Sequence, residues 1–224
     1  MHNGKKVFCK RNSIAFDSKS NLTRKGYTIM PRKRQSTKSR IVKSAWTLFY
    51  KKGYDKTTID DIIAASKTSK GSFYHYFKGK EALLNSMSYL FDDKYEELYN
   101  TIDTNLSAYD KLLLLNYELF HMIETSIDVK LVGYLYSSQL VTKDKRSLLE
   151  RKRFYFKWLT EIFDTALQSG EFHDSSTTDE LMKIYAMFER ALLYDWALCK
   201  KRYSLSEYSA KLLPSVLDSF VRGL

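Results

Sequence analysis

The chain has 224 residues, of which 44% are hydrophobic, and its formal net charge is +11. This length allows one large domain or two modest ones, and the apolar content is sufficient for a buried core. Two prolines and eight glycines argue against a β-rich or disordered chain. Two cysteines are too few for a disulfide scaffold, so we expect a reducing cytoplasm. No run approaches the roughly 20 apolar residues of a membrane helix, so we expect no membrane partner.

The positive charge is concentrated at the N-terminal end. Residues 1–36 hold ten Lys/Arg and one Asp, residues 37–87 hold ten Lys/Arg and four Asp/Glu, and the remainder is net acidic. A basic N-terminal part, residues 1–87, followed by an acidic remainder favours a polyanion as the partner of the N-terminal part. For residues 1–36, a solvated basic tail is an equally good interpretation.

Residues 1–30 are expected to form a basic, disordered extension. Residues 1–29 show no helical period and few apolar side chains, and they lack the apolar centre of a signal peptide. The first firm helix is expected over residues 37–52. Ser36 or Thr37 can cap its start, and Gly53 stands where helices usually end.

Residues 58–77 predict two short helices joined by a tight turn. Thr58 can cap the first helix and Ser69 the second, because a hydroxyl at a helix start accepts a bond from a free backbone N–H. Phe73 and Phe77 are the apolar anchors of the second helix, whose other residues are small, polar or amphipathic. Two short helices with this connection form a helix-turn-helix, whose second helix enters the major groove of DNA.

Gly71 lies in the middle of this second helix. A glycine there costs roughly 1 kcal/mol of helix stability relative to alanine. Close approach to a base edge explains its presence, and a local kink is the alternative.

The pattern remains helical from residue 80 to the C-terminus. Helices are expected over residues 80–101, 112–127, 129–139, 148–169, 178–201 and 206–222. Thr177 and Glu180 form a capping box at the start of the fifth of these. Pro214 either kinks the last helix or begins its main segment. The fold class is therefore all-α.

The last two helices are apolar over an unusually wide arc. Leu181, Ile184 and Phe188 lie on one side of the helix over 178–201, with Met187 and Trp196 beside them. Helices of this kind need cover on two sides. A four-helix interface between two subunits provides it, and a central position in a monomer is the alternative.

Motifs for catalysis and metal binding are absent from the sequence. It contains no H-E-x-x-H, C-x-x-C, G-x-S-x-G or G-x-G-x-x-G, and its four histidines are scattered. We therefore expect no enzyme, no catalytic residue, no metal site and no cofactor.

The helix-turn-helix region resembles the DNA-binding signature of the tetracycline-repressor (TetR) family of bacterial regulators. The resemblance covers residues 37–87 and is carried by residues 57–58, 62, 64–65, 69–72, 74–77 and 80–83. The family usually has Gly in the turn, where this chain has Lys67, and Val next, where this chain has Thr68. Positive φ is costlier for Lys than for Gly, so we expect a strained or differently shaped turn.

The resemblance implies an N-terminal three-helix DNA-binding domain over residues 31–85 and a C-terminal helical domain for effector binding and dimerisation over residues 86–224. Because residues 30–34 look like a typical start of such a regulator, we expect translation to begin at Met30. The implied function is a ligand-responsive transcriptional regulator, a repressor. It binds a near-palindromic double-stranded DNA operator as a homodimer and is released by a small-molecule effector.

Site residues follow from the same resemblance. Lys70 is the first candidate for a base edge. The other candidates on or before the second helix are Ser69, Gly71, Ser72, Tyr74 and His75. Phosphate contacts are expected from Thr37, Thr58, Tyr76 and Lys80. The effector pocket is expected to include Tyr117, His121, Tyr134, Tyr155 and Trp158, although a place in the core is the better explanation for each of them.

A different class of function is also compatible with the composition. The chain could be a helical small-molecule or acyl-chain binding protein whose basic end meets RNA or an anionic membrane. The spacing of the helix-turn-helix argues against this alternative.

Overall fold

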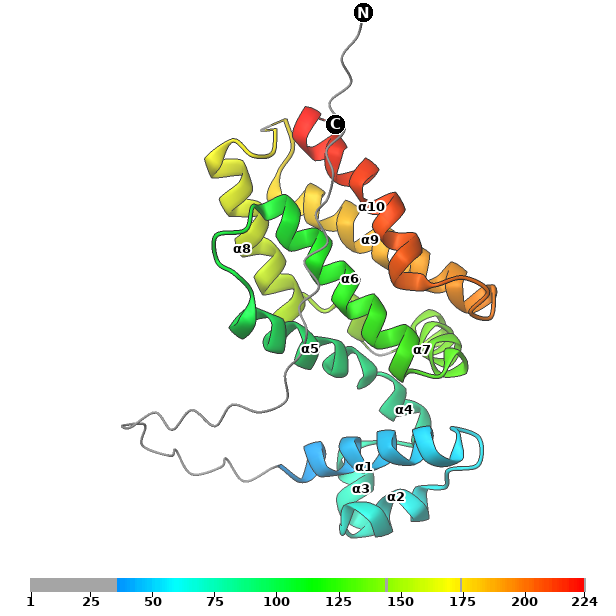
Figure 1. The fold of residues 1–224 in the computed structure, drawn as a ribbon. Coiled ribbons are helices and arrows are strands. Elements are labelled where there is room, and N and C mark those ends of the chain that lie inside the picture. The colour runs from blue at the N-terminus through cyan, green and yellow to red at the C-terminus, as the bar shows by residue number, and fades with distance from the viewer. Residues whose placement is uncertain (1–35, 144, 174, 224) are drawn as a thin grey trace, which may run out of the picture. The chain divides into compact units, whose positions relative to one another are not determined.

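The computed structural model describes residues 36–143, 145–173 and 175–223. Within these residues the chain forms α-helices and one 3₁₀ turn and no strand, which confirms the all-α class (Figure 1). The expectations for residues 1–35, including the start at Met30, lie outside the described residues. The N-terminal helices are α1 (Thr37–Lys52), α2 (Ile59–Ser66), α3 (Lys70–Tyr76), α4 (Lys80–Leu84) and α5 (Met87–Thr101). The others are α6 (Ala108–Ser126), α7 (Val129–Val141), η1 (Ser147–Leu149), α8 (Phe154–Ser169), α9 (Thr178–Leu198) and α10 (Leu205–Arg222).

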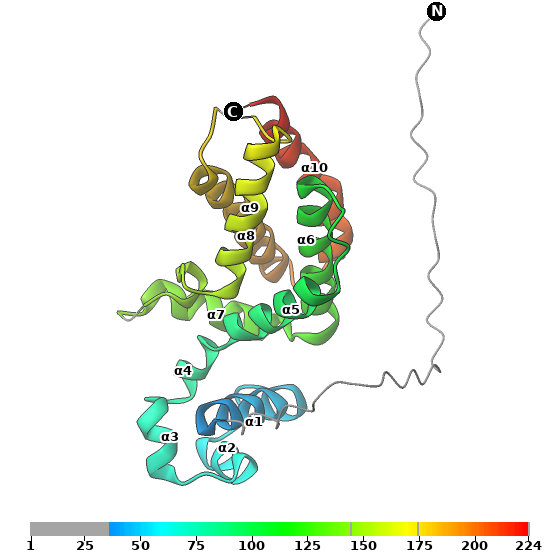
Figure 2. The ribbon, with the colours of Figure 1, turned by 90° about the vertical axis from the view of Figure 1, so that its left-hand side faces the viewer.

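The first three helices pack against one another and form the expected helix-turn-helix unit (Figures 1 and 2). Of the two expected caps for α1, Ser36 is the one used, because its Oγ accepts from the Ser39 N–H at 3.1 Å. Gly53 ends α1 with a φ of 82°. Thr58 caps α2 in a reciprocal capping box with Asp61.

The turn between α2 and α3 contains the expected strained residue. Lys67 has φ 52° and ψ 48°, which is the left-handed region that glycine usually occupies. Its N–H donates to the Ala64 carbonyl and the Thr68 N–H to the Ile63 carbonyl, both at 3.2 Å. These bonds satisfy the end of α2, so the turn keeps a regular helix-ending shape at the cost of backbone strain.

The single helix expected over residues 80–101 is wrong, because the chain breaks between α4 and α5 at Asn85 and Ser86. The Ser86 hydroxyl donates to the Leu83 carbonyl and accepts from the Trp46 indole N–H at 2.9 Å. The Asn85 side chain accepts a hydrogen bond from Gln139 on α7. Side chains of this kind compete with the helical pattern, and here they fix the break against α1 and α7.

The remaining helices build the larger core. Helix α6 packs along α10, and α9 contacts α7, α8 and α10. Two glutamates cap the N-terminal ends of helices that lie far from them in the sequence. Glu171 accepts hydrogen bonds from the Ala108 and Tyr109 N–H groups of α6. Glu124 accepts hydrogen bonds from the N–H groups at the start of α10. Hydrogen bonds from the start of α10 lower the pKa of Glu124 against the raising effect of burial.

The helix expected over residues 148–169 begins six residues late. Residues Ser147–Leu149 form the 3₁₀ turn, and Arg153 keeps an extended backbone before α8. The reason is a buried ion pair: Arg153 Nε and Nη2 each lie 3.0 Å from an oxygen of Asp92 on α5. Both residues are 6% exposed, and Arg153 also donates to the Ser88 carbonyl at 2.9 Å. This pair fastens α5 to the start of α8.

The last two helices follow the sequence closely. Thr177 and Glu180 form the expected capping box, and Pro214 lies inside α10 without ending it. No helix in the described ranges is both long and apolar enough to cross a membrane.

Replacing Lys67 with Gly is expected to raise the free energy of unfolding by about 0.5–1 kcal/mol. Strain of roughly 1–2 kcal/mol in the left-handed region exceeds the entropy that glycine adds to the unfolded chain. Chemical denaturation measures the difference. Lys67→Ala is the matched control, because it keeps the Cβ atom and should give no gain. A Lys67→Gly protein that is less stable than the parent contradicts the assignment of strain.

Candidate functional site

The outer face of α3 is the feature that can meet DNA. Phe73 is fully buried and Phe77 is 5% exposed, so both anchor the helix inward as expected. Tyr74 is 47% exposed and Tyr76 is 42% exposed. Three further candidates are also exposed: Lys70, Gly71 and His75. The side chains on this face include hydrogen-bond donors, which the edges of base pairs require.

Hydroxyl groups organise the start of α3. The Ser69 Oγ accepts from the Ser72 N–H at 3.1 Å and donates to the Ser72 Oγ at 3.0 Å. Ser69 is therefore the helix cap that the sequence predicted. Ser72 is only half-exposed, and its side chain takes part in this cap. The observed role of Ser69 and Ser72 is therefore to stabilise the N-terminal end of α3.

Gly71 has no structural reason to be glycine. A Cβ atom at this position would meet only the Ser69 Oγ, at 3.9 Å. No kink is needed either, since α3 runs from Lys70 to Tyr76 without a break. Close approach to a partner, the first explanation given by the sequence, stays a prediction.

The phosphate candidates lie in different environments. Thr37 is the first residue of α1 and is half-exposed, and Thr58 is exposed at the start of α2. Both lie at helix N-termini, where anions are favoured. The Thr58 hydroxyl already accepts from the Asp61 N–H at 3.1 Å. The Asp61 carboxylate accepts from the Lys52 ammonium group at 2.8 Å and from the Thr58 N–H at 3.0 Å, and these bonds lower the pKa of Asp61 to about 2.

Lys80 corrects one expectation. Its ammonium group donates to the carbonyl oxygens of Tyr54 at 2.7 Å and Thr57 at 3.1 Å, with the Asp55 carbonyl at 3.4 Å. It also lies 4.2 Å from the centre of the Tyr54 ring. The Lys80 side chain therefore points into the protein and fixes the α1–α2 loop, residues 53–58, so a phosphate contact at this position would have to use the backbone N–H groups at the start of α4.

The α1–α2 loop is held from its other side by α7. The Tyr134 hydroxyl donates to the Asp55 carboxylate, with its two oxygens at 2.9 and 3.0 Å. The rings of Tyr134 and Tyr54 lie 4.7 Å apart. The hydrogen bond to Asp55 raises the pKa of Tyr134, with burial as the next cause. Tyr134, expected in the effector pocket, is instead a contact between α7 and the DNA-binding helices.

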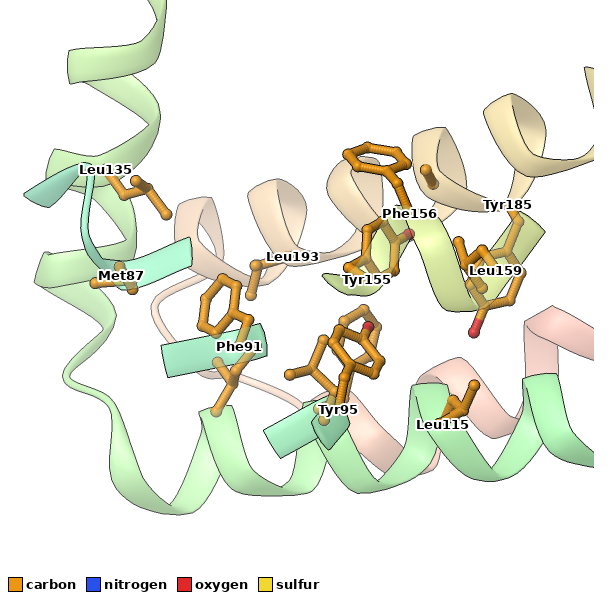
Figure 3. Close-up of a cluster of buried hydrophobic side chains, with 14 of the residues drawn as sticks. Met87, Phe91, Tyr95, Leu115, Leu135, Tyr155, Phe156, Leu159, Tyr185 and Leu193 are labelled. Atoms are coloured by element: carbon orange, nitrogen blue, oxygen red, sulfur yellow. The ribbon is translucent and has the colours of Figure 1, made fainter. Parts of the chain in front are cut away.

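A cavity of about 50 Å³ lies between α5, α6, α7, α8 and α9. Its lining is mainly aromatic and aliphatic, and it includes the charged residues Arg153, Glu189 and Arg190. Figure 3 shows the neighbouring core, in which Tyr95 from α5 and Tyr155 from α8 lie together; their ring centres are 5.0 Å apart. Burial raises the pKa of both tyrosines well above the usual value.

Tyr155 is the one of the five pocket candidates that lines this cavity. Trp158 is buried but lines a separate groove beside α5 and α6. Tyr117 and His121 stack on each other at the surface of α6, with ring centres 6.0 Å apart, and the Tyr117 hydroxyl lies 3.4 Å from Glu207. Four of the five expected residues are thus elsewhere, because an aromatic residue on a helix is not assigned to a face by its type alone.

Sequence reasoning missed Glu189, which is 6% exposed. A carboxylate in the middle of the apolar stripe of α9 was the available signal, because glutamate is almost never fully buried without a partner. Its Oε2 accepts from the Tyr155 hydroxyl at 2.6 Å and its Oε1 from the Asn116 side chain at 3.1 Å. Burial raises the pKa of Glu189 and these donors oppose the shift.

Comparison with known proteins assigns the helix-turn-helix to a family. The family described as bacterial regulatory proteins, tetR family, matches residues 41–87. The chain is 33% identical to YuxN, an HTH-type transcriptional regulator of Bacillus subtilis, over 129 residues that make up 55% of this chain and 44% of YuxN. It is 44% identical over 46 residues to IcaR of Staphylococcus aureus, a negative transcriptional regulator of the biofilm operon icaADBC; these are 20% of this chain and 25% of IcaR. Residues 41–87 of the chain therefore match the DNA-binding region of the TetR family.

The fold also agrees with this match to the TetR family. FadR of Thermus thermophilus, a TetR-family transcriptional repressor solved in complex with lauroyl-CoA, has a TM-score of 0.66 and 22% sequence identity, covering 80% of this chain and 92% of FadR. Identity at this level shows a shared fold and no more. The alignments span less than half the length of YuxN and a quarter of IcaR. These relatives are transcriptional regulators, and the matched residues 41–87 include α3.

Replacing Gly71 with Ala is expected to separate stability from DNA binding. Helix propensity should raise the free energy of unfolding by about 1 kcal/mol, while the added methyl group on the outer face of α3 should weaken binding to operator DNA. Denaturant titration measures the change in stability. Fluorescence anisotropy measures binding to operator DNA, which is first identified by selecting bound duplexes from a random pool.

Gly133→Ala in α7 is the matched control. A Cβ atom at Gly133 meets nothing within 4 Å, so this variant should gain similar stability and leave DNA binding unchanged. Unaltered operator affinity in Gly71→Ala contradicts close approach at this position.

Proposed function

We propose that this protein is a ligand-responsive transcriptional repressor of the TetR family that binds a near-palindromic operator as a homodimer. Residues 31–85 would bind DNA, and residues 86–224 would bind the effector and the second subunit. The observation that carries the proposal is the capped, outward-facing α3, with Phe73 and Phe77 buried and a glycine that packing does not require. Lys70, exposed at the start of α3, remains the first candidate for a base edge.

Dimerisation is supported by apolar side chains on the outside of the last two helices. On α9, Met187 is 52% exposed and Leu198 is 61% exposed; on α10, Val221 is 47% exposed. Tyr194 and Leu212 add to the same two helices. Apolar surface of this extent favours burial against a second copy. Two-fold symmetry then requires two half-sites separated by whole helical repeats.

Repression is supported by two similar proteins, since IcaR is a negative transcriptional regulator and FadR of Thermus thermophilus is a transcriptional repressor. The effector is proposed to enter the cavity beside Tyr155. At about 50 Å³ this cavity is well below the roughly 300–1,000 Å³ of typical ligand pockets. A ligand as long as the lauroyl-CoA of FadR would therefore require the core to open.

The route from the cavity to DNA is proposed to run along α7. Tyr136 lines the cavity, and its hydroxyl donates to the Arg190 carbonyl at 2.8 Å. Two residues earlier, Tyr134 holds Asp55 in the α1–α2 loop. A ligand that displaces Tyr136 would shift α7 and thereby move the loop that positions α2 and α3. Differential binding to two such arrangements typically gives a coupling of about 1–3 kcal/mol.

Selection of bound duplexes from a random pool tests the function. The expected product is a pair of inverted half-sites, protected symmetrically in a footprint. Met187→Glu on α9 should give a monomer by analytical ultracentrifugation and should lose binding to the paired site. Leu140→Glu is the control, because Leu140 is 74% exposed but lies on α7. Sequence-independent binding to any polyanion decides for the alternative, a small-molecule binding protein with a basic end.

Tyr134→Phe tests the link between α7 and the DNA-binding helices. Loss of the hydroxyl removes the bond to Asp55, so amide hydrogen exchange in residues 53–58 should become faster. Operator affinity should fall several-fold, because a freer loop loses more conformational entropy on binding. Tyr117→Phe, which removes a hydroxyl far along α6, should change neither quantity. Unchanged exchange in the loop of Tyr134→Phe excludes the link.

A further inference from the structure

We propose that the cavity between α5 and α9 binds an organic cation, a protonated amine carried on an apolar or aromatic body. Its partners would be the Glu189 carboxylate, the Tyr95 hydroxyl and the surrounding aromatic rings. This inference rests on the proposed function, since it names the chemical class of the effector for the same site.

Glu189 is the first element of the site. It lies among buried side chains and forms no ion pair with any residue that the structure describes. Its Oε2 accepts from Tyr155 and its Oε1 from Asn116, and the Tyr185 hydroxyl also acts on the carboxylate and opposes the rise of its pKa on burial. A carboxylate offers about four acceptor positions. A buried charge is costly unless it is paired. A ligand ammonium group supplies both the missing charge and the missing donors.

The positive residues nearby do not fill this role. The Arg153 guanidinium is held by both oxygens of Asp92 and by the Ser88 carbonyl. Arg190 follows Glu189 in the chain and its charge lowers the pKa of Glu189 slightly, but the side chain is half-exposed and makes no ion pair within the described ranges. Glu189 therefore lines the cavity without a cation bound to it.

Tyr95 is the second element. It is 2% exposed, its hydroxyl makes no hydrogen bond of ordinary length to a described residue, and Glu189 is near enough to be, after burial, the next cause that raises its pKa. A buried hydroxyl without a partner is destabilising. The ring lies beside that of Tyr155, whose hydroxyl is bonded to Glu189 (Figure 3). An ammonium group with three N–H donors can bond to the Tyr95 oxygen and to the free acceptor positions of Glu189 together.

The walls favour the same class of ligand. Phe91, Phe120 and Tyr136 line the cavity in addition to the two tyrosines, and aromatic faces attract cations within about 6 Å. The volume of about 50 Å³ is sufficient for a head group. Tyr136, Leu148 and Arg190 are partly exposed lining residues, so the apolar body would extend towards the surface on their side.

Three probes with closely similar bodies test the head group: 2-phenylethylamine, 2-phenylethanol and 3-phenylpropanoate. Isothermal titration of the full chain at neutral pH should give tightest binding for the amine, by about tenfold over the alcohol. Glu189→Gln should remove this preference while it leaves the affinity for the alcohol unchanged. Tyr95→Phe should weaken amine binding several-fold.

Tyr109→Phe is the matched control variant. The Tyr109 hydroxyl donates to the Asp218 carboxylate of α10 at 3.0 Å, and Tyr109 does not line the cavity. Amine affinity should therefore stay at the parental value. Thermal unfolding of each variant establishes that it is folded, and Tyr95→Phe keeps the test available if Glu189→Gln does not fold.

Other outcomes overturn the inference. Tightest binding of 3-phenylpropanoate would make the cavity an anion site that uses Arg190. Equal binding of the three probes, or no binding of the amine, would reduce the cavity to an ordinary feature of the core.

Operator binding is measured separately in the same samples. If the amine binds but leaves operator affinity unchanged, the cation site stands and release by an effector is excluded. If the protein binds its operator but does not bind the amine, the proposed regulatory function is kept and the proposed cation site is excluded.

Discussion

The DNA-reading helix depends on neighbours for its existence. Seven residues form α3, whereas isolated helices shorter than about 12–15 residues are marginal in water. Phe73 and Phe77 join the same buried cluster as residues of α1 and α2, and Ser69 satisfies the helix start. Because packing and capping supply the stability, the outer positions of α3 need not favour a helix. They are free to carry a glycine and polar side chains.

The position of α3 depends on the α1–α2 loop, which Lys80 of α4 holds through backbone carbonyls and Tyr134 of α7 holds through Asp55. The rings of Tyr54 and Tyr134 add an aromatic contact at the same place, with their centres 4.7 Å apart. Polar and aromatic contacts therefore link this loop to helices outside the three-helix unit.

Signals that act over a few residues were readable in the sequence. Ser69, Gly53 and the pair Thr177 and Glu180 mark helix ends through hydrogen bonds that span three or four positions, and the structure has all of them. Lys80 shows the limit. Its sequence position at a helix start predicts an outward cation, but its partners lie more than twenty residues away. The break at Asn85 likewise depends on Gln139, a residue of another helix.

The effector region shows this limit most clearly. An aromatic side chain is compatible with core, surface and pocket, so Tyr117, Tyr134 and Tyr155 could not be told apart by type, and they now occupy three different environments. Glu189 carried more information, because a carboxylate is expensive to bury and must have a reason to be inside. Polar residues that interrupt an apolar stripe are therefore better indicators of a binding site than the aromatic residues around them. In this chain the Asp92–Arg153 pair shows the structural use of such residues, in which the charges neutralise each other. Glu189 has no such counter-ion among the described residues, so charge neutralisation within the core does not explain why it is buried.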